Sequence, residues 1–379
     1  MPSLYFHIPF CHHKCIYCDF YSVARKFDTS VYTDALIREL IYRKDFFQNM
    51  NESKQKEYLD SIYFGGGTPS LLNIKDIARV FDTIHKYFAL SPDCEITFEA
   101  NPENINTEYV LGLKQIGINR ISLGVQSFED KDLKLLNRSH TSLLAKKAIE
   151  ILMDSGLQNI SIDLISNLPN TSLQGWKKNL ETFLYYGLPH ISCYNLMRED
   201  GTMLDKLLTK EKLFLLEEKE QIEQMKLTYE ILHQNNYIHY ETSSFALQGF
   251  YSRHNMAYWT FRKYLGLGAG AHSYNSKERF WNIADLYQYT ERIFSDDFTS
   301  IMEKETLTNK NKYNEYVMLT ARLNKGLSLN YVKKNFPEYF SYFSCQITQL
   351  IKTGFLTSEL CPTQKGWLLQ NNLILSLII

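Results

Sequence analysis

The chain has 379 residues, of which 44% are hydrophobic and 22% charged, and its formal net charge is −1. This length supports a sizeable core, and the balanced charge argues against the broad basic surface that nucleic-acid binding requires. The seven cysteines do not form the dense framework of a small secreted disulfide scaffold, so we expect a reducing, cytoplasmic setting.

The first two hundred residues alternate short apolar strands with longer helical patterns. Strands are expected at 4–8, 61–64, 95–98, 120–125, 159–165 and 190–194. Helices are expected at 28–49, 73–88, 107–116, 129–136, 142–155 and 172–186. Such repeats imply parallel strands joined by right-handed crossovers, and six units fall short of the eight that close a (β/α)8 barrel. We therefore predict an α/β fold with a partial (β/α)6 barrel over residues 1–200.

The rhythm changes in residues 201–305, which we interpret as an extension of the barrel. A long charged helix is expected at 211–234 and a tyrosine-rich strand at 237–243. The run His254–Trp259 and a glycine-rich stretch at 265–273 follow. This segment does not continue the earlier β/α alternation.

The last segment, residues 306–379, reads as a separate small module. Helices are expected at 313–323, 329–335 and 339–352, and two short strands at 353–356 and 363–367. That order is typical of a winged-helix-like α+β module. Winged helices often bind DNA, but this segment has no basic recognition stripe, so we predict no nucleic-acid partner.

Three cysteines near the start, Cys11, Cys15 and Cys18, have the spacing C-x3-C-x2-C. Three thiolates can hold three irons of a [4Fe–4S] cube and leave the fourth iron open for a ligand. Two other interpretations stay open from the spacing alone, namely three unrelated core cysteines and a zinc site. The fourth zinc ligand would be one of the neighbouring residues His12, His13 and Asp19.

Glycine or polar residues follow four of the expected strands. The loop Gly65–Ser70 follows the second strand, and Glu99, Gln126 and Asp163 lie at the ends of the next three. The carboxyl ends of parallel strands are where such folds place their functional side chains. Taken alone, the glycines also suit a tight turn, and Glu99 also suits a solvated loop.

The flanks of the cysteines, Tyr5–Cys11 and Cys15–Phe20, resemble the opening of the radical S-adenosylmethionine (SAM) enzymes, and within them the coproporphyrinogen III oxidase family. The resemblance implies a [4Fe–4S] cluster on Cys11, Cys15 and Cys18, with SAM bound at the open iron and cleaved on reduction. The positions that match SAM contacts of the family are Tyr5, Tyr17, Gly66, Gly67, Thr68, Glu99, Gln126, Arg138 and Asp163. Asn167 stands where the family usually has glycine, and asparagine tolerates left-handed backbone well.

Two features separate the branches of that family. The oxidases carry a further cysteine two positions after the third cluster ligand, where this chain has Phe20, and a long segment ahead of the cluster. The run His254–Trp259 matches the HNxxYW motif of the heme chaperones of the HemW type. An imidazole can ligate heme iron axially, so His254 is a candidate heme ligand, although a core histidine is the common alternative. His272 is a second candidate.

The resemblance thus implies a heme chaperone that binds a [4Fe–4S] cluster, SAM and heme and passes heme to apo-hemoproteins such as respiratory cytochromes. Peripheral membrane association and a homodimer are further expectations. Only three residues precede Leu4, so we expect no targeting segment, and the apolar tail 373–379 is too short to span a membrane. The alternatives are an oxidase that decarboxylates coproporphyrinogen III and a zinc-bound scaffold without redox chemistry.

Overall fold

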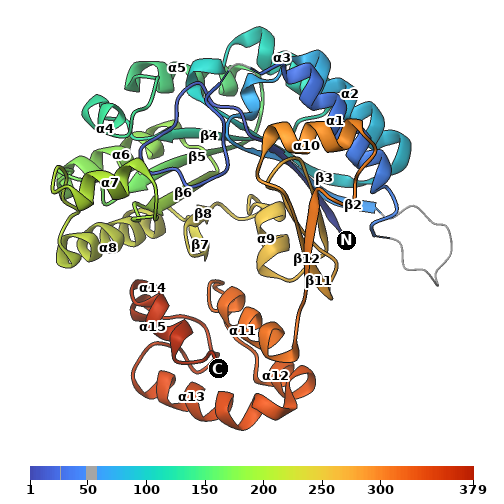
Figure 1. Cartoon of the computed structure of the whole chain (residues 1–379). Coiled ribbons are helices and arrows are strands. Elements are labelled where there is room, and N and C mark those ends of the chain that lie inside the picture. The colour runs from blue at the N-terminus through green and yellow to red at the C-terminus, as the bar shows by residue number, and fades with distance from the viewer. Residues whose placement is uncertain (26, 48–57) are drawn as a thin grey trace.

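The computed structural model describes residues 1–25, 27–47 and 58–379. Within these residues, twelve strands form one sheet in the order β12-β11-β10-β9-β1-β2-β3-β4-β5-β6-β8-β7. The strands from β9 through β1 to β6 run parallel, and the strands beyond them on both sides are antiparallel. Figure 1 shows this sheet curved into an open barrel with helices along its outer side.

The first six strands confirm the predicted β/α alternation. They are β1 Ser3–Ile8, β2 Tyr58–Gly66, β3 Ala89–Ala100, β4 Arg120–Gln126, β5 Asn159–Ser166 and β6 His190–Asn195. The helices that follow them are α1 Thr29–Tyr42, α2 Ile74–Tyr87, α3 Thr107–Ile116, α4 Asp130–Leu135, α5 Ser142–Asp154 and α6 Leu173–Tyr186. Short 3-10 turns at Pro69–Leu71 and Pro102–Asn104 lie between strand and helix.

Side-chain caps explain where several of these helices begin. Asp28 accepts a hydrogen bond from the backbone N–H of Ser30, and Asn73 accepts one from that of Asp76. Each cap satisfies a donor that the first helical turn leaves without a partner. Helix α1 ends at Tyr42, earlier than predicted, and the predicted end at Asn49 lies outside the described residues.

The extension adds strands to the same sheet. Its elements are α7 Met203–Thr209, α8 Glu218–Gln234, β7 Ile238–Glu241, β8 Ser244–Ala246, α9 Arg253–Trp259, β9 Tyr264–Leu267, β10 His272–Tyr274, β11 Glu278–Asn282, α10 Leu286–Phe294 and β12 Met302–Thr306. The predicted single strand at 237–243 is in fact the hairpin β7–β8, and the predicted helix at 211–234 begins only at Glu218. HNxxYW lies on the short helix α9.

Strand β9 lies in the glycine-rich stretch, for which the sequence analysis predicts no strand. It pairs parallel with β1, placing Leu265 beside Leu4 and Gly266 beside Tyr5. A Cβ atom on Gly266 would lie 2.0 Å from the carbonyl oxygen of His272, so only glycine allows the two backbone segments to approach this closely. The parallel sheet therefore has one strand more than the six-unit prediction.

The last segment forms its own hydrophobic core, which includes Tyr313, Val317, Phe343 and Leu373. Its helices are α11 Asn309–Thr320, α12 Leu329–Asn335, α13 Phe340–Lys352, α14 Gln364–Leu368 and α15 Gln370–Leu375. The predicted strand at 363–367 is wrong, because Thr363 accepts a hydrogen bond from the backbone N–H of Gly366 and starts α14. The predicted strand at 353–356 is also wrong, because the pairing there is limited to the bridge between Leu356 and Pro362.

The two faces of the sheet differ in chemistry. Apolar side chains such as Ile62, Phe64 and Phe98 pack against the helices in the main core. Side chains on the opposite face are polar, and Ser61 and Arg120 are examples that are both at most 1% exposed. None of the helices in the described part of the chain is long and apolar enough to cross a membrane.

Candidate functional site

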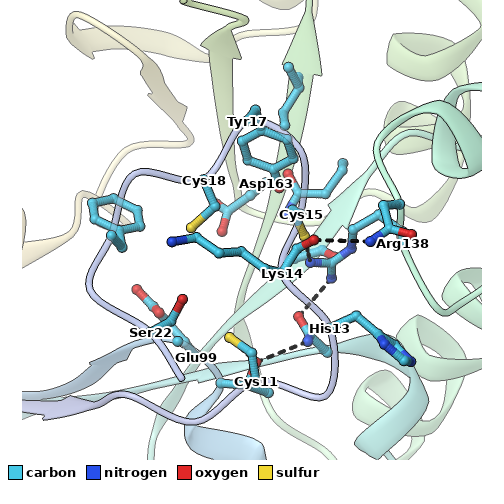
Figure 2. Close-up of a pocket in the computed structure, with 18 of the residues that line it drawn as sticks. Cys11, His13, Lys14, Cys15, Tyr17, Cys18, Ser22, Glu99, Arg138 and Asp163 are labelled. Atoms are coloured by element: carbon cyan, nitrogen blue, oxygen red, sulfur yellow. Dashed lines mark hydrogen bonds between the residues drawn. The ribbon is translucent and has the colours of Figure 1, made fainter. Parts of the chain in front are cut away.

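A cavity of about 330 Å³ lies at the carboxyl ends of the parallel strands. Its lining combines the loop that carries the three cysteines with polar side chains at the ends of β3, β4 and β5. Predicted site residues in this lining are Cys11, Cys15, Tyr17, Cys18, Gly66, Gly67, Thr68, Glu99, Gln126, Arg138 and Asp163. The volume falls within the range of small-molecule sites. Figure 2 shows the sulfur atoms turned toward the same space.

The cysteine loop is anchored at both ends and in its middle. The backbone N–H of Val23 donates to the Pro9 carbonyl at 2.6 Å, which closes the loop. Ile16 is buried in a small cluster with Leu136, and its backbone bonds to that residue and to Leu204. The three cysteines themselves are only partly buried. The loop thus holds its backbone fixed while presenting three thiols to the cavity.

Polar side chains contact two of the three thiols. Thr68 Oγ1 lies 3.6 Å from Cys11 Sγ, and a guanidinium nitrogen of Arg138 lies 3.4 Å from Cys15 Sγ. Asn101 connects these two residues, since it donates to Thr68 at 3.3 Å and accepts from Arg138 at 2.7 Å. Hydrogen bonds to cluster sulfurs are among the factors that set the properties of iron–sulfur centres.

The glycine loop after β2 packs directly under the cysteine loop. A Cβ atom on Gly67 would lie 3.0 Å from Cys11 Sγ and 2.7 Å from the Phe10 carbonyl oxygen. Gly66 has φ +112°, and a Cβ there would meet the ring of His7 at 2.7 Å. A side chain at Gly67 would displace the cysteine loop, and one at Gly66 would displace the His7 ring of β1, so both glycines are required for close approach.

Glu99 is the acidic group on the floor of the cavity. Its carboxylate accepts hydrogen bonds from the Tyr63 hydroxyl at 2.7 Å and from the Gly66 backbone N–H at 3.2 Å. Burial, assisted by the nearby Asp163, raises the pKa of Glu99 to about 7, although the Tyr63 hydrogen bond opposes this shift. A cationic ligand in the cavity would therefore stabilise the ionised form of this carboxylate.

Gln126 and Asp163 complete the strand ends. Gln126 has φ 67°, an uncommon conformation for a residue with a side chain, and the β4–β5 register shifts between Leu123 and Gln126. Such strained positions are typical of ligand sites. Asp163 accepts a hydrogen bond from Ser122 at 3.2 Å, and burial raises its pKa.

Three predicted residues lie outside the cavity lining. Tyr5 has its hydroxyl 3.1 Å from Nδ1 of His7. His254 is 1% exposed and has both ring nitrogens in hydrogen bonds, Nδ1 with Ser61 at 2.9 Å and Nε2 with Tyr258 at 2.9 Å. His272 is exposed on β10. The structure therefore separates the HNxxYW segment from the cysteine cavity.

Two functional candidates were missed from the sequence. Asn101 links the residues that contact Cys11 and Cys15, and Tyr63 holds Glu99. A signal for Tyr63 existed, because Ser61, Tyr63 and Gly65 alternate along β2 and therefore share the polar face. Asn101 gave no signal beyond its place two residues after Glu99.

Asn167 confirms the expectation for the glycine-to-asparagine departure. Its φ is 60°, in the left-handed region where asparagine is better tolerated than most residues. Its backbone N–H donates to Gln224 at 2.9 Å, and its side chain donates to Asn195 at 3.2 Å. The turn after β5 therefore keeps the glycine-like geometry, and the side chain adds a hydrogen bond.

The residues present fit an iron–sulfur cluster with a charged small ligand. The thiols belong to one loop, the Gly67 backbone leaves room against Cys11, and Arg138 and Glu99 offer opposite charges to a zwitterion. In the described ranges, no group of three or more His, Cys, Asp or Glu side chains is arranged to hold a single metal ion.

The fold and the cavity together define a class. A barrel of parallel β/α units with the C-x3-C-x2-C loop at its carboxyl end is the architecture of radical SAM proteins, and the family model "Radical SAM superfamily" matches residues 5–183. One similar protein is the heme chaperone HemW of Lactococcus lactis subsp. lactis (strain IL1403), which is 36% identical over 98% of this chain and 95% of the relative. Another is the heme chaperone HemW of Bacillus subtilis (strain 168), which is 31% identical over 98% of this chain and 97% of the relative. The chain belongs to the HemW family.

A solved structure supports the fold over nearly the full length. The coproporphyrinogen III oxidase HemN from Escherichia coli, described as a radical SAM enzyme, aligns with a TM-score of 0.82 over 99% of this chain and 89% of that one. Its sequence identity is 22%, so the likeness establishes the architecture alone.

Proposed function

We propose that this protein is a cytoplasmic heme chaperone, which binds heme and passes it to apo-hemoproteins, and that its cavity holds a [4Fe–4S] cluster and SAM. The observation that carries the cofactor part of the proposal is the cavity itself, where the three cysteines of one loop meet Glu99 and Arg138. The full-length similarity to HemW proteins supports the chaperone branch.

The chain's own residues divide the work of holding these cofactors. Cys11, Cys15 and Cys18 would ligate three irons, and Arg138 and Glu99 would orient the carboxylate and the cationic groups of SAM. When bound, the cluster and SAM supply one-electron chemistry, while the protein supplies placement and electrostatics.

Phe20 is consistent with a chaperone. It lines the cavity and is 63% exposed at the position where the oxidases carry a further cysteine. An apolar ring there supplies contact area but no thiol chemistry.

The recipients that we propose are respiratory cytochromes. Delivery at the membrane surface and a homodimer are parts of the same proposal.

Heme titration of the anaerobically reconstituted protein tests the proposal. We expect a Soret band that saturates and that His254→Ala weakens, since His254 is the proposed axial ligand. His233→Ala is the matched control, because His233 is exposed near the end of α8. A band that is unchanged in His254→Ala would remove this residue as ligand, and absence of heme binding would remove the chaperone proposal.

The oxidase alternative is tested in the same preparation. Reduced protein with SAM and coproporphyrinogen III should release no carbon dioxide at catalytic rates. Release at such rates would replace the chaperone proposal with an oxidase.

A further inference from the structure

A short chain of contacts joins helix α9 to the floor of the cofactor cavity. The ring of His254 on α9 stacks on the ring of Tyr63 on β2, with centroids 4.8 Å apart and an interplanar angle of 30°. The hydroxyl of Tyr63 donates to Glu99 at 2.7 Å. One aromatic ring therefore contacts both the HNxxYW motif and the carboxylate that faces the cavity.

His254 is held in this position from several sides. Its two ring nitrogens bond to Ser61 and Tyr258, each at 2.9 Å. The backbone N–H groups of Arg253 and His254 donate to the Glu95 carboxylate at 2.9 and 3.0 Å, which fixes the start of α9 to β3. The imidazole is thus fully satisfied and 1% exposed.

An imidazole with both nitrogens occupied cannot also ligate a metal. To bind heme iron, His254 must give up its bond to Ser61 or to Tyr258 and turn toward the porphyrin. Either movement changes the position of the ring that stacks on Tyr63. The Tyr63 side chain then loses a stacking partner that fixes the direction of its hydroxyl toward Glu99.

Glu99 depends on that hydroxyl for its orientation. Its hydrogen bonds come from Tyr63 at 2.7 Å and from the Gly66 backbone at the longer distance of 3.2 Å. When the shorter bond is lost, the carboxylate becomes less well placed for a ligand in the cavity. Tyr5 lies beside both rings, with centroids 6.0 Å from Tyr63 and 6.2 Å from His254, so the whole cluster would rearrange together.

We propose that Tyr63 is a positioning residue that couples the two sites, so that ligation of heme iron by His254 weakens SAM binding at Glu99. The inference rests on the proposed function, because it takes heme and SAM as the two ligands. By linkage the effect is reciprocal, so SAM weakens heme binding by the same factor. Heme and SAM then oppose each other's binding within one protein.

The test measures SAM affinity in the cluster-containing protein under anaerobic conditions, by equilibrium dialysis with and without saturating heme. In the wild type, heme should weaken SAM affinity by about fivefold or more, a typical size for coupled sites. In Tyr63→Phe, SAM should bind about fivefold more weakly without heme, since one hydrogen bond to a carboxylate is lost, and heme should change this affinity no further.

Two controls separate positioning from a merely structural effect. Tyr109→Phe removes a hydroxyl that donates to the Leu72 carbonyl at 3.0 Å, away from His254 and Glu99, and should retain the full heme effect. Metal-free protoporphyrin IX has no iron to ligate and should leave SAM affinity unchanged. Iron content equal to that of the wild type shows that Tyr63→Phe is folded.

The outcomes are distinct. If heme binds the wild type and SAM affinity does not change, or if heme weakens SAM equally in Tyr63→Phe, the coupling is wrong and the chaperone proposal stands. If the wild type binds no heme at all, the proposed function fails and the coupling fails with it.

Discussion

The guanidinium of Arg138 lies 3.4 Å from Sγ of Cys15, a residue 123 positions away in the sequence. Two further acceptors fix the guanidinium, the Asn101 side chain at 2.7 Å and the Gly124 carbonyl at 2.9 Å. A permanent cation is therefore held beside one thiol of the loop and within the cavity. It serves two purposes in one place, because it stabilises a thiolate and offers a fork of donors to a carboxylate.

Replacing Arg138 should separate these roles. Arg138→Gln should weaken SAM binding by about tenfold or more, since a charged hydrogen bond is lost, while Arg138→Lys should recover part of the affinity. Binding measured by equilibrium dialysis on reconstituted protein checks this. Arg79→Gln, which changes an Arg on α2 that is 46% exposed, is the control and should bind SAM normally. Equal affinity in Arg138→Gln would show that the guanidinium does not contact SAM.

The three cysteines should act as a set. Anaerobic reconstitution should give about four irons per chain and a broad band near 400 nm, and Cys11→Ala, Cys15→Ala or Cys18→Ala should each lower the iron content several-fold. Cys345→Ala on α13 is the control, because this cysteine is exposed and outside the cavity lining. One tightly bound zinc per chain in place of iron would favour the scaffold interpretation.

The ionisation of Glu99 should make SAM binding depend on pH. Burial raises the pKa of this carboxyl to about 7, so in the SAM-free protein a growing fraction is protonated as the pH falls below that value. SAM affinity should therefore weaken as the pH falls from 8 to 6, and Glu99→Gln should bind weakly with little pH dependence. A wild-type affinity that stays constant over this range contradicts the assignment.

Ionisation of Glu99 strengthens SAM binding but lowers the stability of the SAM-free protein. Because the pKa of Glu99 is higher in the folded than in the unfolded chain, its contribution to stability is full below about pH 4.5, declines as the pH rises and is lost once the pH has passed about 7. At pH 8 the ionised carboxylate destabilises the SAM-free protein by on the order of 3 kcal/mol. Thermal unfolding should show Glu99→Gln more stable than wild type at pH 8, with a smaller difference at pH 5.5. No difference at pH 8 would argue against this.

The left-handed turn at Asn167 should tolerate glycine but not a branched residue. Asn167→Val should destabilise the protein by about 1–2 kcal/mol, because φ is 60° at this position. Asn167→Gly keeps the backbone and loses the bond to Asn195, so its effect should be smaller. Asn235→Val is the control, since Asn235 has φ −103°. Melting temperatures in which both Val variants fall equally would refute the conformational explanation.

Local pattern was sufficient to predict much of the fold and site. The apolar strands, the caps Asp28 and Asn73, and the polar residues at strand ends depend on near neighbours or on the general geometry of parallel sheets. The structure places the cysteine loop and Glu99 in one cavity as that geometry implies.

The remainder depended on contacts between distant segments. Strand β9 forms because Gly266 permits close packing against His272, which no local propensity encodes. The helix at Gln364–Leu368 replaces a predicted strand because Thr363 caps its first turn and the helix packs within the module's own core. The hydrogen bond between His254 and Ser61 could not be predicted either, since the two residues are 193 positions apart in the sequence.

The pairing of β1 with both β2 and β9 sets an order of events during protein synthesis. The strand that leads into the cysteine loop leaves the ribosome first, but its second neighbour, Tyr264–Leu267, follows more than 250 residues later. At ordinary elongation rates that interval is roughly 10 to 50 s. We therefore expect iron to be installed after translation has passed β9, so products that end before Tyr264 should emerge without metal.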